Sequence, residues 1–307
     1  AETSVNTNVQ ALVGDNAIFG NGDLGVYADL TPVLHASASG GAGAGLYGAN
    51  AAVAGASNTS TLLASIGNDV VLPSGNVAIM AASSTDQNSS AEGITVGGIL
   101  AVGAADSTST SNITSTASLG DGNGSEAATS GNLTITATGK DTNDASSTAG
   151  SGGLIAGNAS LATTASTSTT KATVGQNLDL DKLANFSLVA MHTTNYGGPA
   201  NSINAAAVGA SGANVNNNQS STADPAPVST TAASIGNGSK IETQGDLHVE
   251  AQSQFASDSN NQGATGGAGG IAVGNAAGVA TTLTANNTTT IGTGVTLAAG
   301  LNPLYAT

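Results

Sequence analysis

Three histidines are the residues of this 307-residue chain best suited to acid–base or metal chemistry. His35, His192 and His248 fall at different phases of an internal repeat, so nothing predicts that they converge on one catalytic or metal site. His248 lies between two residues expected to face inward, and side chains alternate along a strand, so His248 should point to solvent. We therefore interpret all three as isolated surface histidines.

Acidic residues form a second pattern that could do chemistry. Asp15, Asp69 and Asp121 come just after an aliphatic–glycine pair, and Asp179 and Asp181 alternate along one segment. Carboxylate oxygens are ligands that Ca²⁺ prefers, but the calcium-binding nonapeptide repeat Gly-Gly-x-Gly-x-Asp is absent. Turn-stabilising or solubilising acids are the favoured interpretation. No cofactor is predicted, and Ca²⁺ at the acidic turns is kept as an alternative.

The composition excludes several classes of function. The chain has no Arg, a formal net charge of −15 and no Cys, and its four cations are Lys140, Lys171, Lys182 and Lys240. Such a chain repels nucleic acid, lacks the clustered cations of phosphate chemistry and forms neither a disulfide nor a thiolate metal site. Polysaccharide lyases need basic residues, and no Gly-x-Ser-x-Gly elbow is present. The chain is therefore predicted not to be an enzyme, with no catalytic residues.

An internal repeat of about 55 residues organises the chain. An aliphatic residue followed by glycine recurs six times, with the glycines 53, 53, 55, 61 and 56 residues apart. Self-similarity at a fixed period is typical of repeat architectures. It predicts one continuous segment, residues 1–307, with repeats starting near 11, 64, 117, 172, 233 and 289. The predicted turn glycines are Gly14, Gly67, Gly120, Gly175, Gly236 and Gly292.

A second anchor, Gly-Asp-Leu-x-Val-x-Ala and its variants, follows each of the first five starts. Its alternation of apolar and polar residues is that of a half-buried strand. The glycine and the Asn or Asp before it are turn chemistry, with glycine supplying a positive φ. The alternating apolar residues should stack as an inward ladder: Leu24, Val77, Leu133, Phe186 and Leu247, joined by Val26, Ile79, Ile135, Leu188 and Val249.

A third anchor is a stretch of glycine, alanine and aliphatic residues. It lies near residues 45–54, 97–105, 152–160, 205–213 and 269–280. Small side chains allow close approach of backbones, so these return strands should form a smooth strip with little relief. The strip is predicted to be either the narrowest part of the interior or a lateral contact between rods.

These anchors predict an all-β fold, since no segment shows a helical apolar stripe. Stacked repeats bury narrow apolar faces in a thin continuous column, and Asn and Thr at equivalent places form ladders along it. Because a coil of a parallel β-helix takes roughly 20 to 28 residues, each repeat is predicted to make two coils. The prediction is a right-handed parallel β-helix of about five and a half repeats. A β-sandwich array and a left-handed solenoid are the alternatives.

The Gly-Asp-Leu-x-Val-x-Ala strands, the Ile-Gly-x-Gly turns and the glycine/alanine return strands resemble the repeats of very large Gram-negative exoproteins. These are the filamentous haemagglutinin-like adhesins and the passengers of large autotransporters. The resemblance covers essentially the whole chain. It implies a right-handed β-helix that is secreted and displayed at the extracellular side of the outer membrane as an adhesin or filament. The family's secretion domain and a membrane anchor are not recognisable in this segment.

Three functions are compatible with such a rod: an adhesin shaft for attachment to surfaces or cells, a self-assembling extracellular filament, and an ice- or mineral-binding face. The last is suggested by the runs Thr108-Ser109-Thr110 and Thr167-Ser168-Thr169. The segment begins and ends inside the repeat pattern, so we expect a piece of a longer rod or copies stacked end to end. The expected partners are such copies and an unknown surface receptor, without nucleic acid. No apolar run is long enough to span a membrane.

Overall fold

The computed structural model describes residues 1–123, 131–196, 200–218, 229–257, 263–280 and 284–300. Within these ranges every helix or strand is a β-strand, and the paired strands run parallel. The prediction of an all-β fold with parallel strands is confirmed. In this part of the chain no helix is therefore long and apolar enough to cross a membrane.

The strands form three sheets. The largest contains twelve strands: β1 (Glu2–Val5), β3 (Leu24–Leu30), β4 (Val33–Ala44), β5 (Tyr47–Asn58), β7 (Val77–Gly97), β8 (Leu100–Ser111), β10 (Leu133–Ser166), β13 (Phe186–Tyr196), β14 (Ala200–Asn218), β17 (Leu247–Ser257), β18 (Gly263–Gly269) and β19 (Ala272–Ala280). The second contains β2 (Asn8–Val13), β6 (Thr61–Ile66), β9 (Thr114–Leu119), β11 (Thr169–Val174), β15 (Ser229–Ile235) and β20 (Ala285–Ile291). The third contains β12 (Asp179–Leu183), β16 (Lys240–Thr243) and β21 (Thr296–Ala299).

Each repeat makes one turn of the stack. Leu133 pairs with Val77 of the preceding turn and with Phe186 of the following one, and side-chain hydrogen bonds between the same turns span 56 and 53 residues. The prediction of two coils per repeat is therefore wrong. The reason is that the Ser/Thr/Asn runs continue the strands, so that β7 is 21 residues long and β10 is 34.

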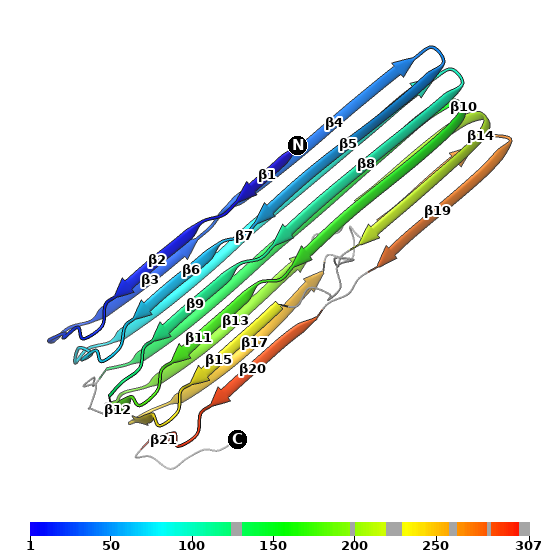
Figure 1. Ribbon diagram of the computed structural model, residues 1–307. Coiled ribbons are helices and arrows are strands. Elements are labelled where there is room, and N and C mark those ends of the chain that lie inside the picture. The colour runs from blue at the N-terminus through cyan, green and yellow to red at the C-terminus, as the bar shows by residue number, and fades with distance from the viewer. Residues whose placement is uncertain (124–130, 197–199, 219–228, 258–262, 281–283, 301–307) are drawn as a thin grey trace.

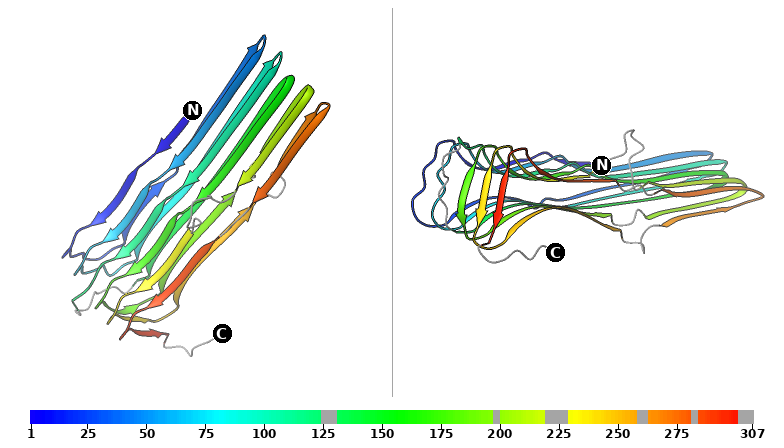
Figure 2. Two further views of the ribbon diagram at one scale, coloured as in Figure 1. Left: turned by 45° about the vertical axis from the view of Figure 1, so that its right-hand side comes forward. Right: turned by 90° about the horizontal axis from the view of Figure 1, so that it is seen from below.

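Each turn is drawn out into a flat loop of two layers (Figures 1 and 2). In the second turn β7 runs outward, the chain reverses at Gly98 and Ile99, and β8 and β9 return along the other layer. The layers touch, since Ser89 Oγ of β7 lies 2.7 Å from Ser107 Oγ of β8. We call the reversing end the tip and the end that carries the third sheet the base. The part beyond the base, residues 83–115 in the second turn and 139–170 in the third, is the arm, and it ends in the tip.

The base contains the larger apolar core. The aliphatic ladder on the strands that leave the base faces the interior. The last inward-facing residues of the returning strands pack against it: Ile66, Leu119, Val174 and Ile235. The third sheet adds Leu180 and Ile241, which are fully buried. Burying a Leu, Ile or Phe side chain stabilises the fold by about 1.5 to 3 kcal/mol, so this core is a main source of stability.

The arm has a different interior. Its apolar cluster consists of alanines and one leucine: Leu34, Ala36, Ala52, Ala54, Ala56, Ala91, Ala105 and Ala149. The other inward positions are largely polar and buried, among them Gln87, Asn143, Thr164 and a series of serines. Such small side chains suit two layers that lie close together, and they meet in pairs across the gap. One example is Ser115 Oγ, which donates to Ser83 Oγ at 2.9 Å.

Candidate functional site

The ten residues of the predicted ladder stand in two files along the base core. Successive members pair in parallel register from turn to turn. Members in the middle turns are fully buried, as Leu133 and Ile135 are, whereas Leu24, Leu247 and Val249 in the outer turns are partly buried against the same core. The ladder thus lies in the interior and holds the base together.

The six turn glycines form a third file at the end of the second sheet. The N–H of Gly120 donates to the carbonyl of Ile66 at 2.8 Å, and the N–H of Gly175 donates to that of Leu119 at 2.8 Å. A Cβ atom at Gly175 would overlap the backbone of Gly120. From Gly67 onward the file therefore requires glycine, because the backbone of the preceding turn lies too close for any side chain, whereas Gly14 in the first turn has open space around it.

Beside these glycines a file of polar side chains ties each turn to the next. Asp15 Oδ1 accepts the backbone N–H of Asn68 at 2.6 Å, and Asn68 Oδ1 accepts that of Asp121 at 2.8 Å. Asp121 Oδ1 in turn accepts the N–H of Gln176 at 2.8 Å. Asp69 has a different role: its φ of 54° lies in the left-handed region, which Asp and Asn tolerate. These acids stabilise the turns.

The two remaining acids of the proposed calcium pattern lie on β12 near lysines. Asp179 Oδ1 is 3.7 Å from Lys240 Nζ, and Asp181 Oδ2 is 3.7 Å from Lys182 Nζ. Across the described ranges, no three His, Asp or Glu side chains gather in a way that would hold a metal ion. Four of the five acidic residues singled out in the sequence thus contact backbone N–H groups or lysines: Asp15, Asp121, Asp179 and Asp181.

A second polar file precedes the ladder strands. Asp23 Oδ1 accepts the backbone N–H of Asn76 at 2.8 Å, and Asn76 Oδ1 accepts that of Asn132 at 3.1 Å. Farther along, Asn185 Nδ2 donates to Asn132 Oδ1 at 2.7 Å, and the N–H of Asp246 donates to Asn185 Oδ1 at 2.8 Å. The stacked Asn and Asp side chains form an axial ladder, as in other in-register parallel stacks.

The glycine that precedes each Asn or Asp of this file was predicted to have a positive φ. The prediction is confirmed for Gly22, whose φ is 118°. It is wrong for Gly75, Gly131 and Gly245, whose φ angles are not in the left-handed region. A Cβ at Gly75 would instead overlap the carbonyl of Gly22. Close stacking of backbones, rather than turn geometry, selects glycine here.

One position of the arm brings together a histidine and an aspartate. His192 of β13 stacks in register on Gly139 of β10, where a Cβ would overlap His192 Nδ1. The imidazole therefore leans over the glycine into the third turn. There Nδ1 lies 3.1 Å from Thr170 Oγ1, and Nε2 lies 3.3 Å from Asp141 Oδ2. His192 is 1% exposed, so the interpretation of this residue as a surface histidine is wrong.

Asp141 is the centre of a buried polar cluster. It is fully buried and accepts hydrogen bonds from four hydroxyls: Thr85, Ser111, Ser166 and Ser168. Burial by itself raises the pKa of Asp141, but the hydrogen bond and charge of His192 and the hydroxyls of Ser168 and Ser166 outweigh burial and leave the pKa lowered. The folded arm therefore favours the ionised carboxylate.

Thr170, His192 and Asp141 have the order hydroxyl, imidazole and carboxylate that nucleophilic enzymes use. Thr170 and His192 are each 1% exposed and Asp141 is completely buried. A substrate cannot reach a group inside two packed layers, so the cluster acts as a polar core that joins the third and fourth turns. The sequence does carry one signal of this cluster, since Gly139 aligns with His192 in the repeat. A glycine leaves space for the large side chain of the residue stacked on it.

The other two histidines lie on the surface, as expected. His35 is exposed. His248 is more than half exposed, and its Nε2 lies 2.9 Å from Glu250 Oε2 on the same face of β17.

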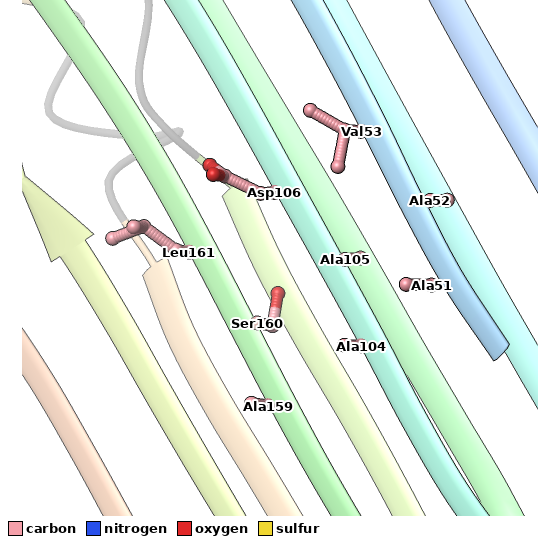
Figure 3. A pocket seen from close by; sticks show the side chains of 9 residues that line it. All are labelled: Ala51, Ala52, Val53, Ala104, Ala105, Asp106, Ala159, Ser160 and Leu161. Carbon is pink, nitrogen blue, oxygen red and sulfur yellow. The ribbon is translucent and has the colours of Figure 1, made fainter. Parts of the chain in front are cut away.

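The return layer has a hollow of about 350 Å³ on its outer face (Figure 3). Its floor consists of one alanine from each of three adjacent strands in register: Ala51, Ala104 and Ala159. Two residues farther along the same strands, a wall is formed by Val53, Asp106 and Leu161. Burial raises the pKa of Asp106, and its Oδ1 is shielded from solvent without a hydrogen-bond partner.

Large apolar side chains are exposed at the tip. Each of four turns presents one where the chain reverses: Leu46, Ile99, Leu154 and Ile271. The next residues on the return strands, Tyr47, Leu100 and Ile155, are also exposed. The expectation of a smooth strip is therefore wrong for residues 45–54, 97–105 and 152–160, because aliphatic side chains rise beside the alanines. The side chains of residues 205–209 lie outside the described residues.

The first threonine run does not form a file of threonines, whereas Thr169 of the second run stacks in register with Thr61, Thr114 and Thr230. Thr108 stacks between Gly55 and Thr163, and Thr110 stacks between Ser57 and Ala165. Ser109 between them is buried, and so is Ser168 of the second run.

No protein-family model, curated protein or solved structure matches this chain.

Proposed function

We propose that the chain is a structural rod of a secreted or cell-surface bacterial adhesin, on the extracellular side of a Gram-negative outer membrane. In this proposal its repeats form a right-handed parallel β-helix of about five and a half units. The rod supplies length and rigidity for attachment, and another part of the adhesin binds the receptor. It has no catalytic role and needs no cofactor.

The observation that supports a rod best is the unbroken register of the second sheet. Six successive strands pair in the order β2-β6-β9-β11-β15-β20, and the glycine file joins each to the next through the same backbone hydrogen bond. A further turn lengthens such a stack by about 4.8 Å and repeats contacts that already exist. Turns can therefore be added or removed without a change in the stability per turn. This suits a spacer, whose function depends on its length.

The test is to remove one complete turn. Deleting residues 67–119 joins Ile66 to Gly120, whose N–H already donates to the Ile66 carbonyl, so the files stay in register. We expect a folded rod that is shorter by about 4.8 Å in cryo-electron microscopy. Deleting residues 67–105 serves as a control, because it removes an incomplete turn and should disrupt the fold.

Attachment is measured with beads coated with this chain alone and with cells that display the complete adhesin. A spacer predicts that the beads do not adhere, whereas the displaying cells adhere with or without the deleted turn. Strong, saturable adhesion of the coated beads would assign receptor binding to the rod and contradict the proposal.

A second candidate, a self-assembling extracellular filament, is favoured by the exposed apolar tip. Electron microscopy of the purified chain distinguishes the two, since long fibres formed without any other component would support the filament.

A further inference from the structure

The outer face of the return layer has a ridge beside its hollow. The ridge consists of Tyr47, Leu100 and Ile155, which are in register on β5, β8 and β10 and are 67%, 37% and 47% exposed. The floor of the hollow begins four residues farther along each strand, about 13 Å away at roughly 3.3 Å per residue. Ridge and hollow both run across the strands, so they are parallel to each other.

Apart from Asp106 in the wall of the hollow, the part of this face that carries the ridge and the floor has no charged residue, although the molecule is strongly acidic. The stretches 40–52, 93–105, 148–160 and 265–277 contain no acidic or basic residue, although the formal net charge is −15. Two copies that meet through these stretches oppose no like charges, whereas contact between their bases would bring acids together. The charge distribution therefore favours the tip region as the place where two copies approach.

The wall of the hollow has an unsatisfied hydrogen-bond acceptor. Asp106 lies between Val53 and Leu161 in the register of the sheet, and its shielded Oδ1 has no partner. A hydrogen bond from a donor stabilises a carboxylate oxygen that is shielded from water. The ridge provides such a donor in the exposed hydroxyl of Tyr47.

We propose that this face binds a second copy of the chain about a two-fold axis, with the arms antiparallel and the ridge of each copy in the hollow of the other. Tyr47 of each copy donates its hydroxyl to Asp106 of the other. A two-fold contact makes every interaction twice. Both surfaces repeat at the strand spacing of about 4.8 Å, so successive turns of one copy meet successive turns of the other.

This inference rests on the proposed rod for its biological use, because it turns a single shaft into a paired one. The dimer can fail while the rod stands, since the turns are joined by backbone pairing and by inward side chains, whereas the dimer uses the outward side chains of the ridge and the hollow.

The first experiment is sedimentation of the purified chain over a range of concentrations. We expect a concentration-dependent dimer that is abolished when Leu100→Asp and Ile155→Asp are combined. Val33→Asp is the matched control, because Val33 is 63% exposed on the other layer, on β4, and its variant should dimerise normally. Tyr47→Phe should weaken the dimer by about tenfold or more, the effect of losing a hydrogen bond to a charged group.

The second experiment uses the absence of cysteine from the chain. Copies with Leu100→Cys are mixed with copies carrying Ala104→Cys under mild oxidation. We expect disulfide-linked heterodimers in excess over homodimers, because the ridge of one copy meets the floor of the other. Val33→Cys mixed with Ala104→Cys should give no excess.

Three outcomes would overturn the proposal. One is a monomer at every concentration, and another is a dimer that the ridge variant retains. The third is a monomer that binds vesicles of neutral phosphatidylcholine through the ridge, which would assign the face to lipid. Circular dichroism of each variant establishes that the strands are retained, so that loss of the dimer is not loss of the fold.

Discussion

The base and the arm belong to the same turns and share one register, yet they are stabilised by different interactions. In the base, a file of Leu, Val and Phe packs against aliphatic residues of the returning strands. A few residues farther along the same strands, inward positions carry Ser, Thr, Asn, Asp and His, paired across a narrow gap. Parallel stacking therefore does not require an apolar interior over its whole length.

The difference shows what each region tolerates. An apolar core depends on volume, so a swap that conserves volume costs less than about 1.5 kcal/mol. A buried polar core depends on matched partners, and loss of one partner leaves the other desolvated and unpaired. We expect the base to accept conservative substitutions and the arm to respond strongly to the loss of one polar group.

The largest effect is expected from Asp141→Ala in the arm. It leaves four hydroxyls without their acceptor and His192 without its ion-pair partner, and breaking a buried pair in this way costs about 3 to 5 kcal/mol. Hydrogen exchange should show lost protection in the arm of the third and fourth turns, with the base retained. Asp29→Ala, at an exposed position, is the control. Equal loss of protection in base and arm would show that the two regions are one cooperative unit.

The same carboxylate makes the arm sensitive to acid. Because the folded pKa of Asp141 is lowered from an ordinary value of about 3.9, its ionisation stabilises the fold at pH values above that ordinary value. This stabilisation is lost as the pH falls from about 3.9 through the folded pKa. Arm protection should begin to decrease as the pH falls below about 3.9, before base protection does, and Asp141→Asn should remove the dependence. Base and arm protection that decrease together with pH, in the native chain and in Asp141→Asn alike, would contradict this.

In the base, Leu133→Ala tests the apolar core. The side chain is completely buried, and its truncation should cost roughly 2 to 4 kcal/mol, measured by urea denaturation. Leu133→Met conserves volume and should cost less than about 1.5 kcal/mol. Val33→Ala, at an exposed site, should change the stability by no more than about 0.5 kcal/mol. A similar cost for Met and Ala at position 133 would mean that shape, not volume, limits the base.

The turn glycines offer a smaller test that is independent of both cores. Gly175→Ala places a Cβ against the backbone of Gly120, and such overpacking costs about 1 to 3 kcal/mol. Gly157 has no atom near the position of a Cβ, so Gly157→Ala should be neutral or slightly stabilising. Thermal denaturation of the two variants compares them directly. Equal melting temperatures would remove the steric explanation of the glycine file.

The smallest effect is expected from Asn76→Ala in the polar ladder. The variant loses the acceptor for the backbone N–H of Asn132 at an exposed edge, where one hydrogen bond contributes about 1 kcal/mol. Ser65→Ala, which removes the partner of Ser118 Oγ, provides a comparison with a partly buried hydroxyl pair. If Asn76→Ala cost as much as Leu133→Ala, the ladder would stabilise the stack as strongly as the base core does.

The sequence by itself determined which residues stack on one another in the base. The repeat alone aligns Leu133 with Val77 and Phe186, and it aligns Gly120 with Gly67 and Gly175. In a parallel in-register stack a repeat in the sequence becomes a file of contacts, so the period and phase of the repeat suffice.

The tertiary structure alone decided how far each strand extends and what the arm encloses. The sequence of a Ser/Thr/Asn run permits a strand but does not show which of its residues face inward, because those positions become recognisable only when a second layer supplies partners, as Ser115 does for Ser83. The burial of His192 likewise depends on a missing side chain at Gly139 and on the carboxylate of Asp141 in the neighbouring turn. Contacts across the layers join residues whose separations differ from the repeat period, and the periodicity carries no information about them.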